Sequence, residues 1–215
     1  MKLVLHSYWR SSASHRVRIG LQLKELAYDY VAVNILKHGQ HADAYRAKNP
    51  MAQVPTLEIT EDDGTVHAIA QSLPILEYLD ERWPAHPLMP TDLLLRARTR
   101  ALAEIINSGI QPLQNLTTTK KLVTAGVDDA AWVRGFISDG LAAFAKLAAA
   151  TAGQFCVGDA PTIADCFLVP QLASARRFNA DIAALTQLLD IEKRCLALPA
   201  FARAMPDQQP DAVKS

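Results

Sequence analysis

Residues 2–25 read KLVLHSYWRSSASHRVRIGLQLKE, a pattern that changes from strand-like to helical partway along. Apolar side chains dominate Lys2 to His6, which predicts a short strand. From Ser12 to Glu25 apolar positions recur at i, i+4, i+7 and i+8, the spacing of one helical face. Tyr28 to Val33 is aromatic and β-branched and predicts a second strand. A strand–helix–strand unit of this kind places its two strands parallel in one sheet.

The next stretch completes a small unit of mixed strands and helices. Residues 42–48 have helical character, and two prolines keep residues 49–55 out of a helix. Two further strands, 56–60 and 66–69, are joined by a connection that ends in Asp-Gly, a strong hairpin signal. A helix then begins with Ser72 in the N-cap position. The predicted element order is β-α-β-α-β-β-α.

A proline-rich segment divides the chain. Residues 83–90 hold three prolines in eight residues, which excludes a regular helix and favours an extended linker. Beyond it helical spacing dominates, with a capping-box pattern at Thr162 and Asp165, and the polar end, 206–215, is expected to be mobile. Helices are expected over 92–110, 128–150, 162–176, 190–196 and 199–205. The expected domains are a mixed α/β domain over 1–83, a linker over 84–91 and an all-α domain over 92–215.

Composition narrows the classes of function. Lysine plus arginine and aspartate plus glutamate both total 22, so the net charge is zero. That balance argues against a general nucleic-acid or membrane-surface binder. No apolar run approaches the roughly 20 residues that a membrane helix needs. The first residues lack the long apolar segment of a signal peptide, so a cytoplasmic protein is expected.

Cysteine and histidine spacing gives no sign of a metal site. The three cysteines, Cys156, Cys166 and Cys195, form no Cys-x-x-Cys pair, and we expect them to be buried small apolar residues. His38 and His41 are close in sequence, but no third ligand lies nearby, so no bound metal is expected. Any thiol chemistry would then use a thiol that a ligand supplies.

The hydroxyl cluster at the start of the first helix has two interpretations. Ser11, Ser12 or Ser14 is an ordinary helix cap, or one of these hydroxyls donates to an anion that helix N–H groups also surround. Helix N-termini and nearby cations lower the pKa of a thiol, so a site of the second kind would hold a thiolate at neutral pH. Arg16 and Arg18 belong to this site, face solvent, or pair with carboxylates elsewhere.

For several other segments the sequence also allows two interpretations, a purely structural role or a role in ligand binding. Gln71 and Ser72 begin a second helix, as a cap or as a carboxylate-binding pair. Val54–Pro55 is an ordinary loop, or a cis bond that leaves the Val54 backbone free for a peptide ligand. The arginines that are either solvated or bind substrate carboxylates are Arg10, Arg176 and Arg177. The polar residues Gln111, Asn115 and 117–119 signal only a turn.

These pieces and several longer segments match one family. The segments are YWRSSAS (8–14) with RVRI (16–19), NPM (49–51) with QVPTL (53–57), QSL (71–73) with ILEYL (75–79), GIQPLQNL (109–116), VGD (157–159) and LVPQ (168–171). Over nearly its whole length the chain resembles the zeta-class glutathione transferases. The serine-rich segment is specific to that class, whereas the capping box is shared by glutathione transferases generally.

The resemblance implies a fold and a set of site residues. The fold would be α/β plus all-α: a thioredoxin-like N-terminal domain and the all-helical C-terminal domain of a glutathione transferase. The protein would be a homodimer with glutathione as cofactor, and Ser11, with Ser12 beside it, would stabilise the glutathione thiolate. Glutathione contacts would come from Ser11, Ser12, Ser14, Arg16, Gln40, Val54, Gln71, Ser72, Gln111, Asn115, Leu116 and Thr117. Candidate residues for substrate carboxylates are Arg177, Arg10 and Arg176.

The class implies glutathione-dependent cis–trans isomerisation of a small dicarboxylate, maleylacetoacetate. Close bacterial relatives act on maleylpyruvate, and they share a Ser-His pair like Ser14-His15 and an Arg-Arg-Phe run like 176–178. A general transferase or haloacid dehalogenase is a further alternative. A non-catalytic binding scaffold is another, and the joint presence of the serine and glutamine site residues argues against it. Ala13 stands where many members carry cysteine, which removes a second thiol from the pocket.

Overall fold

The chain folds into two compact units, described over residues 1–213 in a computed structural model. The first comprises Met1–Leu88 together with the end of the chain from Leu198, and the second comprises Met89–Ala197. The division after Leu88 falls inside the segment 84–91 that its prolines mark as a linker.

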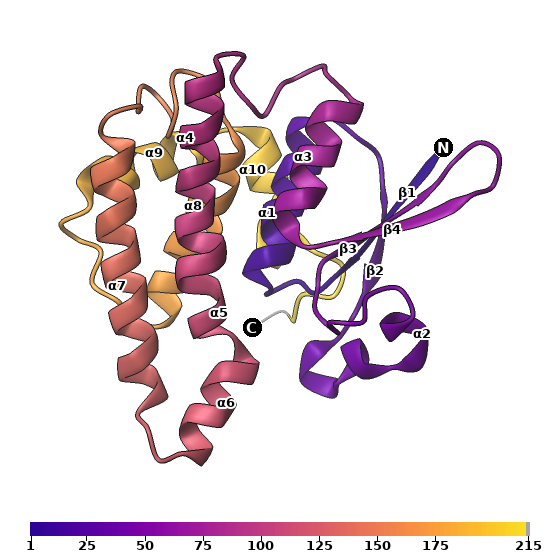
Figure 1. Ribbon diagram of the computed structural model, residues 1–215, viewed down its shortest axis with the longest axis horizontal. Helices are drawn as coiled ribbons and strands as arrows, with labels where there is room; N and C mark the ends of the chain where they lie inside the picture. The colour runs from indigo at the N-terminus through magenta and orange to yellow at the C-terminus, as the bar shows by residue number, and fades with distance from the viewer. Residues whose placement is uncertain (214–215) are drawn as a thin grey trace. The chain divides into compact units, whose positions relative to one another are not determined.

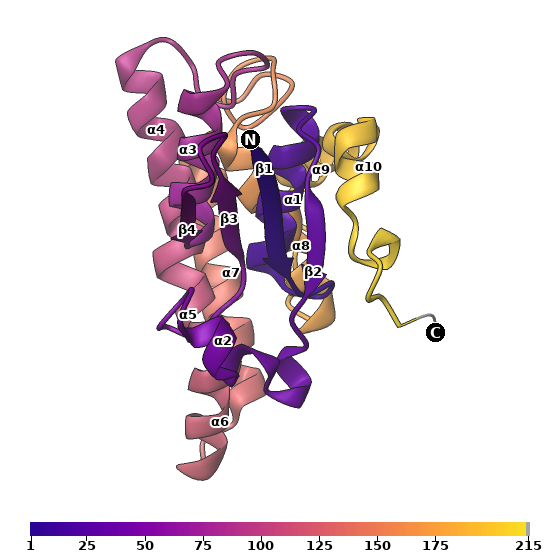
Figure 2. The same cartoon turned by 90° about the vertical axis from the view of Figure 1, so that its right-hand side faces the viewer.

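The first unit is built on a four-stranded sheet with the order β2-β1-β3-β4 (Figure 2). Its strands are β1 (Lys2–Ser7), β2 (Asp29–Ala32), β3 (Thr56–Thr60) and β4 (Val66–Ala70). β1 pairs in parallel with β2, and β3 runs antiparallel to both β1 and β4. The four predicted strands are confirmed to within two residues at each end. The parallel pairing that the strand–helix–strand pattern predicts is confirmed as well.

Helices cover both faces of this sheet. Figure 1 shows α1 (Ser12–Leu23) and α3 (Ser72–Arg82) on one side of the strands and the short α2 (Asp43–Arg46) on the other. Two 3-10 turns, η1 (Ile35–Lys37) and η2 (Gly39–His41), precede α2. The buried core between the sheet, α1 and α3 consists of Leu3, Leu5, Val17, Leu21, Leu57, Ile59, Ile75 and Leu79.

The close approach of α1 and α3 depends on a glycine. A Cβ at Gly20 would lie 2.1 Å from Leu76 Cδ2, well inside van der Waals contact. Any larger residue at position 20 would force the two helices apart or displace Leu76.

The described part of the second unit consists of helices, as the sequence predicts. They are α4 (Leu93–Glu104), the π-helix η3 (Ile105–Ile110), α5 (Gln111–Gln114), α6 (Leu116–Thr124), α7 (Asp129–Ala148), α8 (Ile163–Arg177) and α9 (Thr186–Leu196). One isolated parallel bridge joins Ala152 to Gly158. Over residues 1–213, no helix is long and apolar enough to cross a membrane.

Side-chain caps explain where two of these helices begin. The fully buried Asp165 carboxylate accepts hydrogen bonds from the N–H of Thr162 (2.8 Å) and of Cys156 (2.9 Å), so the capping box is confirmed. The sequence does not predict α6, because the threonines near its start are poor helix formers and are more typical of a loop. Asn115 starts it by accepting from the N–H of Thr117 (3.1 Å). All three cysteines are buried, as expected.

The end of the chain returns to the first unit. α10 (Pro199–Ala204) packs against α1, and Arg18 Nε donates to the carbonyl of Ala204 (3.0 Å). These contacts place the chain from Leu198 with the first unit, whereas the sequence groups it with the helical domain over 92–215. Helical spacing alone does not reveal which unit a short helix packs against.

The segment after α10 is held by hydrogen bonds. It contains the 3-10 turn η4 (Pro206–Gln208), and the buried Gln209 amide donates to two backbone carbonyls at 2.7 and 3.1 Å. Over 206–213 the expected mobility is therefore replaced by an anchored chain. Lys214 and Ser215, which share that expectation, lie outside the described residues.

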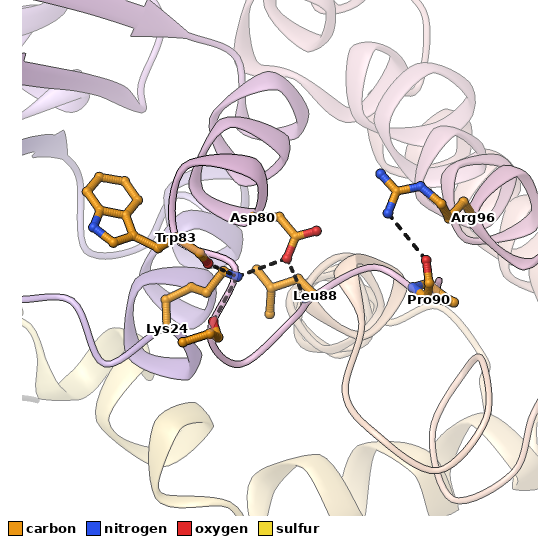
Figure 3. A network of polar contacts seen from close by, with 7 residues as sticks. Lys24, Asp80, Trp83, Leu88, Pro90 and Arg96 are labelled. Carbon is orange, nitrogen blue, oxygen red and sulfur yellow. Dashed lines mark hydrogen bonds and ion pairs between the residues drawn. The ribbon is translucent and has the colours of Figure 1, made fainter. Parts of the chain in front are cut away.

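A buried ion pair fixes the segment that follows α3 (Figure 3). Lys24, the C-cap residue that follows α1, donates from Nζ to Asp80 Oδ1 (2.9 Å) and to the carbonyls of Trp83 (2.7 Å) and Ala85 (3.1 Å). Asp80 Oδ1 also accepts from the N–H of Leu88 (2.6 Å). All three ammonium hydrogens are used, so the pair holds an otherwise irregular segment. Figure 3 also draws, within the second unit, the bond from Arg96 to the Pro90 carbonyl (3.3 Å).

Replacing Asp80 by alanine should lower the free energy of unfolding by about 3–5 kcal/mol, because the Lys24 ammonium stays buried without its counter-charge. Urea unfolding followed by circular dichroism measures the loss. The control is Asp29→Ala, which removes the exposed partner of Lys2 (2.8 Å) and should change stability little. An equal loss in the two variants would contradict the role of the buried pair.

Candidate active site

The register of the sheet brings distant segments to one edge. His6 near the end of β1 pairs with Thr56 at the start of β3, and Thr56 pairs with Ala70 at the end of β4. Ser7 pairs with Ala32, so β2 ends at the same edge. Several candidate residues of the first unit lie within a few residues of these strand ends in the sequence: Ser11, Ser12, Val54, Gln71 and Ser72.

Ser11 is the N-cap of α1. Its Oγ accepts from the N–H of Ser14 at 3.2 Å, and its own N–H donates to the carbonyl of Tyr8 at 3.0 Å. The capping interpretation is therefore confirmed for Ser11. Because Oγ acts as the acceptor in that bond, the hydroxyl hydrogen is left to donate to a bound group. The cap and an anion donor are thus compatible roles of one side chain.

The side chains just inside α1 turn into the protein. Ser14, Arg16 and Arg18 are all at most 1% exposed, so neither arginine faces solvent. Arg16 Nη1 donates to Ser72 Oγ at 3.2 Å, which joins the starts of α1 and α3. Burial lowers the pKa of Arg18 to about 10, so its guanidinium remains charged at neutral pH.

The start of α3 differs in detail from the prediction. Gln71 is the N-cap and Ser72 is the first helical residue. The φ of Gln71 is +73°, in the left-handed region that residues other than glycine seldom adopt. Its Nε2 donates to Gln53 Oε1 at 3.4 Å. The first N–H groups of α3 have no partner inside the helix, as at any helix N-terminus, so they are suited to bind an anion.

The loop before β3 contains a cis peptide bond, Val54–Pro55, which is the second of the two interpretations of that segment. Tyr45 Oη (2.5 Å) and Asn49 Nδ2 (2.8 Å) both donate to the carbonyl of Gln53 and so hold the loop. In residues 1–213 the backbone of Val54 has no hydrogen-bond partner, which is what pairing with a peptide ligand requires.

Gln40 presents a further unsatisfied group. It lies in η2, and its Oε1 is buried with no hydrogen-bond partner in the described residues. A buried acceptor without a donor is costly, and a ligand N–H would remove that cost. The donors at two helix starts, the open Val54 backbone and this acceptor suit a peptide that carries carboxylates and a thiolate. The residues present therefore fit glutathione.

The candidates in the second unit lie around one break between helices. Gln111 begins α5 directly after the π-helix, and its Oε1 accepts from Gln114 Nε2 (3.1 Å). Asn115 caps α6, and the next two residues, Leu116 and Thr117, are exposed. A π-helix of this kind is found often at functional positions.

The three arginines proposed for substrate carboxylates have different surroundings. Arg176 forms a two-pronged ion pair with Glu192, one bond of which is 2.7 Å long, so its guanidinium is already occupied. The guanidinium carbon Cζ of Arg177 lies 4.7 Å from the centre of the Phe178 ring, and Cζ of Arg10 lies 5.7 Å from the centre of the Trp9 ring. The ion pair weakens the case for Arg176 as a residue that binds substrate carboxylates.

Sequence reasoning missed several residues that hold the site. Tyr45 and Asn49 fix the cis-proline loop, and Asp211 accepts from the N–H of Trp9 at 3.1 Å. No local pattern points to Asp211, which stands in a polar stretch far along the chain. The described residues contain no group of three histidine, cysteine or carboxylate side chains that could hold a metal ion.

Comparison with known proteins gives consistent matches. Residues 10–82 match the family described as glutathione S-transferase, N-terminal domain. The chain is 44% identical over 211 residues to a probable maleylacetoacetate isomerase of Drosophila melanogaster, covering 97% of this chain and 89% of the relative. It is 41% identical to a maleylpyruvate isomerase of a Ralstonia species, covering 97% of this chain and 99% of the relative.

A solved structure agrees over almost the full length. It is a crystal structure of maleylacetoacetate isomerase from Anaeromyxobacter dehalogenans with glutathione bound in its active site. The TM-score is 0.92 at 51% identity, covering 99% of this chain and 98% of that one. With the serine-capped helix start, the cis-proline loop and the second helix start at one edge of the sheet, the chain belongs to the zeta class of the glutathione S-transferase family.

Proposed function

We propose that this protein catalyses glutathione-dependent cis–trans isomerisation of maleylacetoacetate to fumarylacetoacetate. The observation that carries the proposal is the start of α1, where the Ser11 hydroxyl has a hydrogen to donate at the positive end of the helix dipole. When bound, glutathione supplies a thiolate that adds reversibly to the double bond, so that rotation occurs about a single bond.

The chain's own contribution is to stabilise negative charge at sulfur and to align the substrate. Ser11 donates a hydrogen bond to the sulfur, and the positive end of the α1 dipole lowers the pKa of the thiol. Arg16 adds a buried cation that reaches the second helix start through Ser72. These groups are in place before the reaction, so little reorganisation is needed as charge develops.

The remaining residues hold the ends of glutathione. The N-terminus of α3, with Gln71 and Ser72, takes a carboxylate, and the Val54 backbone pairs with the peptide portion. Gln40 Oε1 accepts a ligand N–H. Further glutathione contacts from the second unit are assigned to Gln111, Asn115, Leu116 and Thr117.

Substrate recognition is assigned to two arginines. Arg177 and Arg10 bind the substrate carboxylates through the fork of the guanidinium, while Arg176 remains paired with Glu192. We further propose a homodimer in the cytoplasm, with small-molecule partners only.

Maleylpyruvate is the second candidate substrate, favoured by the similar identity to an isomerase of that acid. Supplying glutathione with each maleyl acid and following the fumaryl product decides between them. Faster turnover of maleylacetoacetate, expressed as kcat/KM, is the expected result. Turnover of neither acid would sink the isomerase proposal and leave a conjugating transferase or a binding scaffold.

Replacing Ser11 by alanine should reduce kcat/KM by about 10- to 100-fold, the value of one hydrogen bond to a charged group. The variant should also raise the pKa of the thiol of bound glutathione, which the ultraviolet absorbance of the thiolate reports. Ser12→Ala is the matched control and should have a smaller effect on both quantities. An unchanged rate in Ser11→Ala would move the role to Ser12 or to backbone N–H groups.

His15, also on α1, does not act as a second cation. It is 2% exposed, and burial, with the nearby charges of Arg18 and Arg16, lowers its pKa well below the usual range. The imidazole is therefore neutral at the pH of the reaction, and the positive charge near the start of α1 comes from arginine and the helix dipole.

The neutral state of His15 makes stability depend on pH. Below about pH 6.5 the unfolded chain binds a proton that the folded chain refuses, so stability falls as pH falls toward the folded pKa. Between pH 7 and pH 5 the wild type should lose up to about 2 kcal/mol more than His15→Leu does. Urea unfolding at both pH values measures the difference, with His67→Leu, an exposed histidine, as control. Identical slopes in wild type and His15→Leu would refute the assignment.

A further inference from the structure

The turn that leads into Ser11 is held by two charged side chains from outside it. The N–H of Ser11 donates to the carbonyl of Tyr8 at 3.0 Å and closes a turn around Trp9. The carbonyl of Trp9 accepts from Arg18 Nη2 at 3.0 Å, and its N–H donates to Asp211 Oδ2 at 3.1 Å. The backbone of Trp9 therefore lies between a buried cation and a carboxylate.

Asp211 is itself fixed by a second bond. Its Oδ1 accepts from Tyr30 Oη at 2.6 Å, and Tyr30 stands on β2, paired with Leu5 of β1. Burial, and then the bond to Asp211, raises the pKa of Tyr30, so its phenol stays protonated and remains a donor. One carboxylate oxygen is thus tied to the sheet and the other to the turn.

Arg18 also connects the turn around Trp9 to β1 and to the end of the chain. Besides the Trp9 carbonyl, it donates from Nε to the carbonyl of Ala204 (3.0 Å) and from Nη1 to Ser7 Oγ (3.4 Å). Ala204 ends α10, seven residues before Asp211. The end of the chain is therefore attached to the connection between β1 and α1 through Asp211, and to α1 itself through Arg18.

We propose that Asp211 is a positioning residue for the thiolate site, which fixes the turn around Trp9 and through it the Ser11 hydroxyl and the first N–H groups of α1. The inference rests on the function proposed for Ser11. A hydrogen-bond donor acts on a developing charge only when it is held close to the correct position, and small misplacements lower rates steeply. Asp211 then acts on the reaction through the turn around Trp9, and not through a contact of its own with the sulfur.

The same segment offers a matched control. Asp207 lies four residues before Asp211 in η4, is exposed, and has no side-chain hydrogen bond within the described residues. Removing it changes the net charge by the same amount as removing Asp211 without touching Trp9. Asp211→Asn keeps an acceptor oxygen but loses the charge, and Tyr30→Phe releases only the bond to the sheet.

The experiment compares Asp211→Ala, Asp211→Asn, Tyr30→Phe and Asp207→Ala with the wild type in the full chain. Three quantities are measured: hydrogen exchange of residues 8–16 without glutathione, the pKa of the thiol of bound glutathione, and kcat/KM. We expect faster exchange, a raised thiol pKa and about a tenfold fall in kcat/KM for Asp211→Ala. Asp211→Asn and Tyr30→Phe should show the same changes to a smaller extent, and Asp207→Ala none.

The readouts separate positioning from simple anchoring. A lowered melting temperature in Asp211→Ala with exchange and thiol pKa as in Asp207→Ala would overturn the proposal, because the contact would then serve stability alone. If Asp211→Ala does not fold, the exchange and thiol pKa of Asp211→Asn and Tyr30→Phe decide, and wild-type values in both would overturn it. If the wild type does not lower the thiol pKa, the proposed function fails, while exchange over 8–16 still tests the hold on the turn.

Discussion

The first unit depends on three buried cations, two within α1 and one at the C-cap residue that follows it. Arg16, Arg18 and Lys24 are each at most 4% exposed, and removing a charge from water costs several kcal/mol unless partners replace the water. The partners come from separate segments: Ser72 at the start of α3, backbone carbonyls of the turn before α1 and of α10, and Asp80 near the end of α3. If α1 shifted, at least one buried cation would lose its partners, so the helix fixes the segments around it.

Local chemistry explains why so much of this unit could be predicted. In the strands, apolar and polar side chains alternate or apolar side chains follow one another over a few residues, and proline or Asp-Gly marks the turns between them. The positions of strands and turns therefore follow from residues that are neighbours in the sequence. The same holds for Ser11 and Thr162, because a cap bonds to residues three positions away. Each of these features is decided within a few residues.

The parts that escaped prediction depend on contacts between distant residues. The polar residues 206–213 show no sequence pattern that distinguishes an anchored segment from a mobile one. Asp211 anchors this segment by hydrogen bonds to Trp9 and Tyr30, which lie 202 and 181 positions earlier in the chain. Arg16 and Arg18 would ordinarily be read as solvated, since arginine is rarely buried without a partner. The threonines in the first turn of α6 have low helix propensity, so the sequence does not indicate this helix. Asn115 caps its start, and the helix packs against α5 and α7.

The net charge of the whole chain is zero, but the proposed site contains a local positive region. Arg16 and Arg18 stand in the second turn of α1, the helix N-terminus adds its own positive potential, and His15, which precedes Arg16, is neutral. Because both arginines are buried, salt screens them far less than it screens surface charges. In the proposed function, stabilisation of the thiolate would therefore come from fixed internal charges and dipoles, without a basic surface.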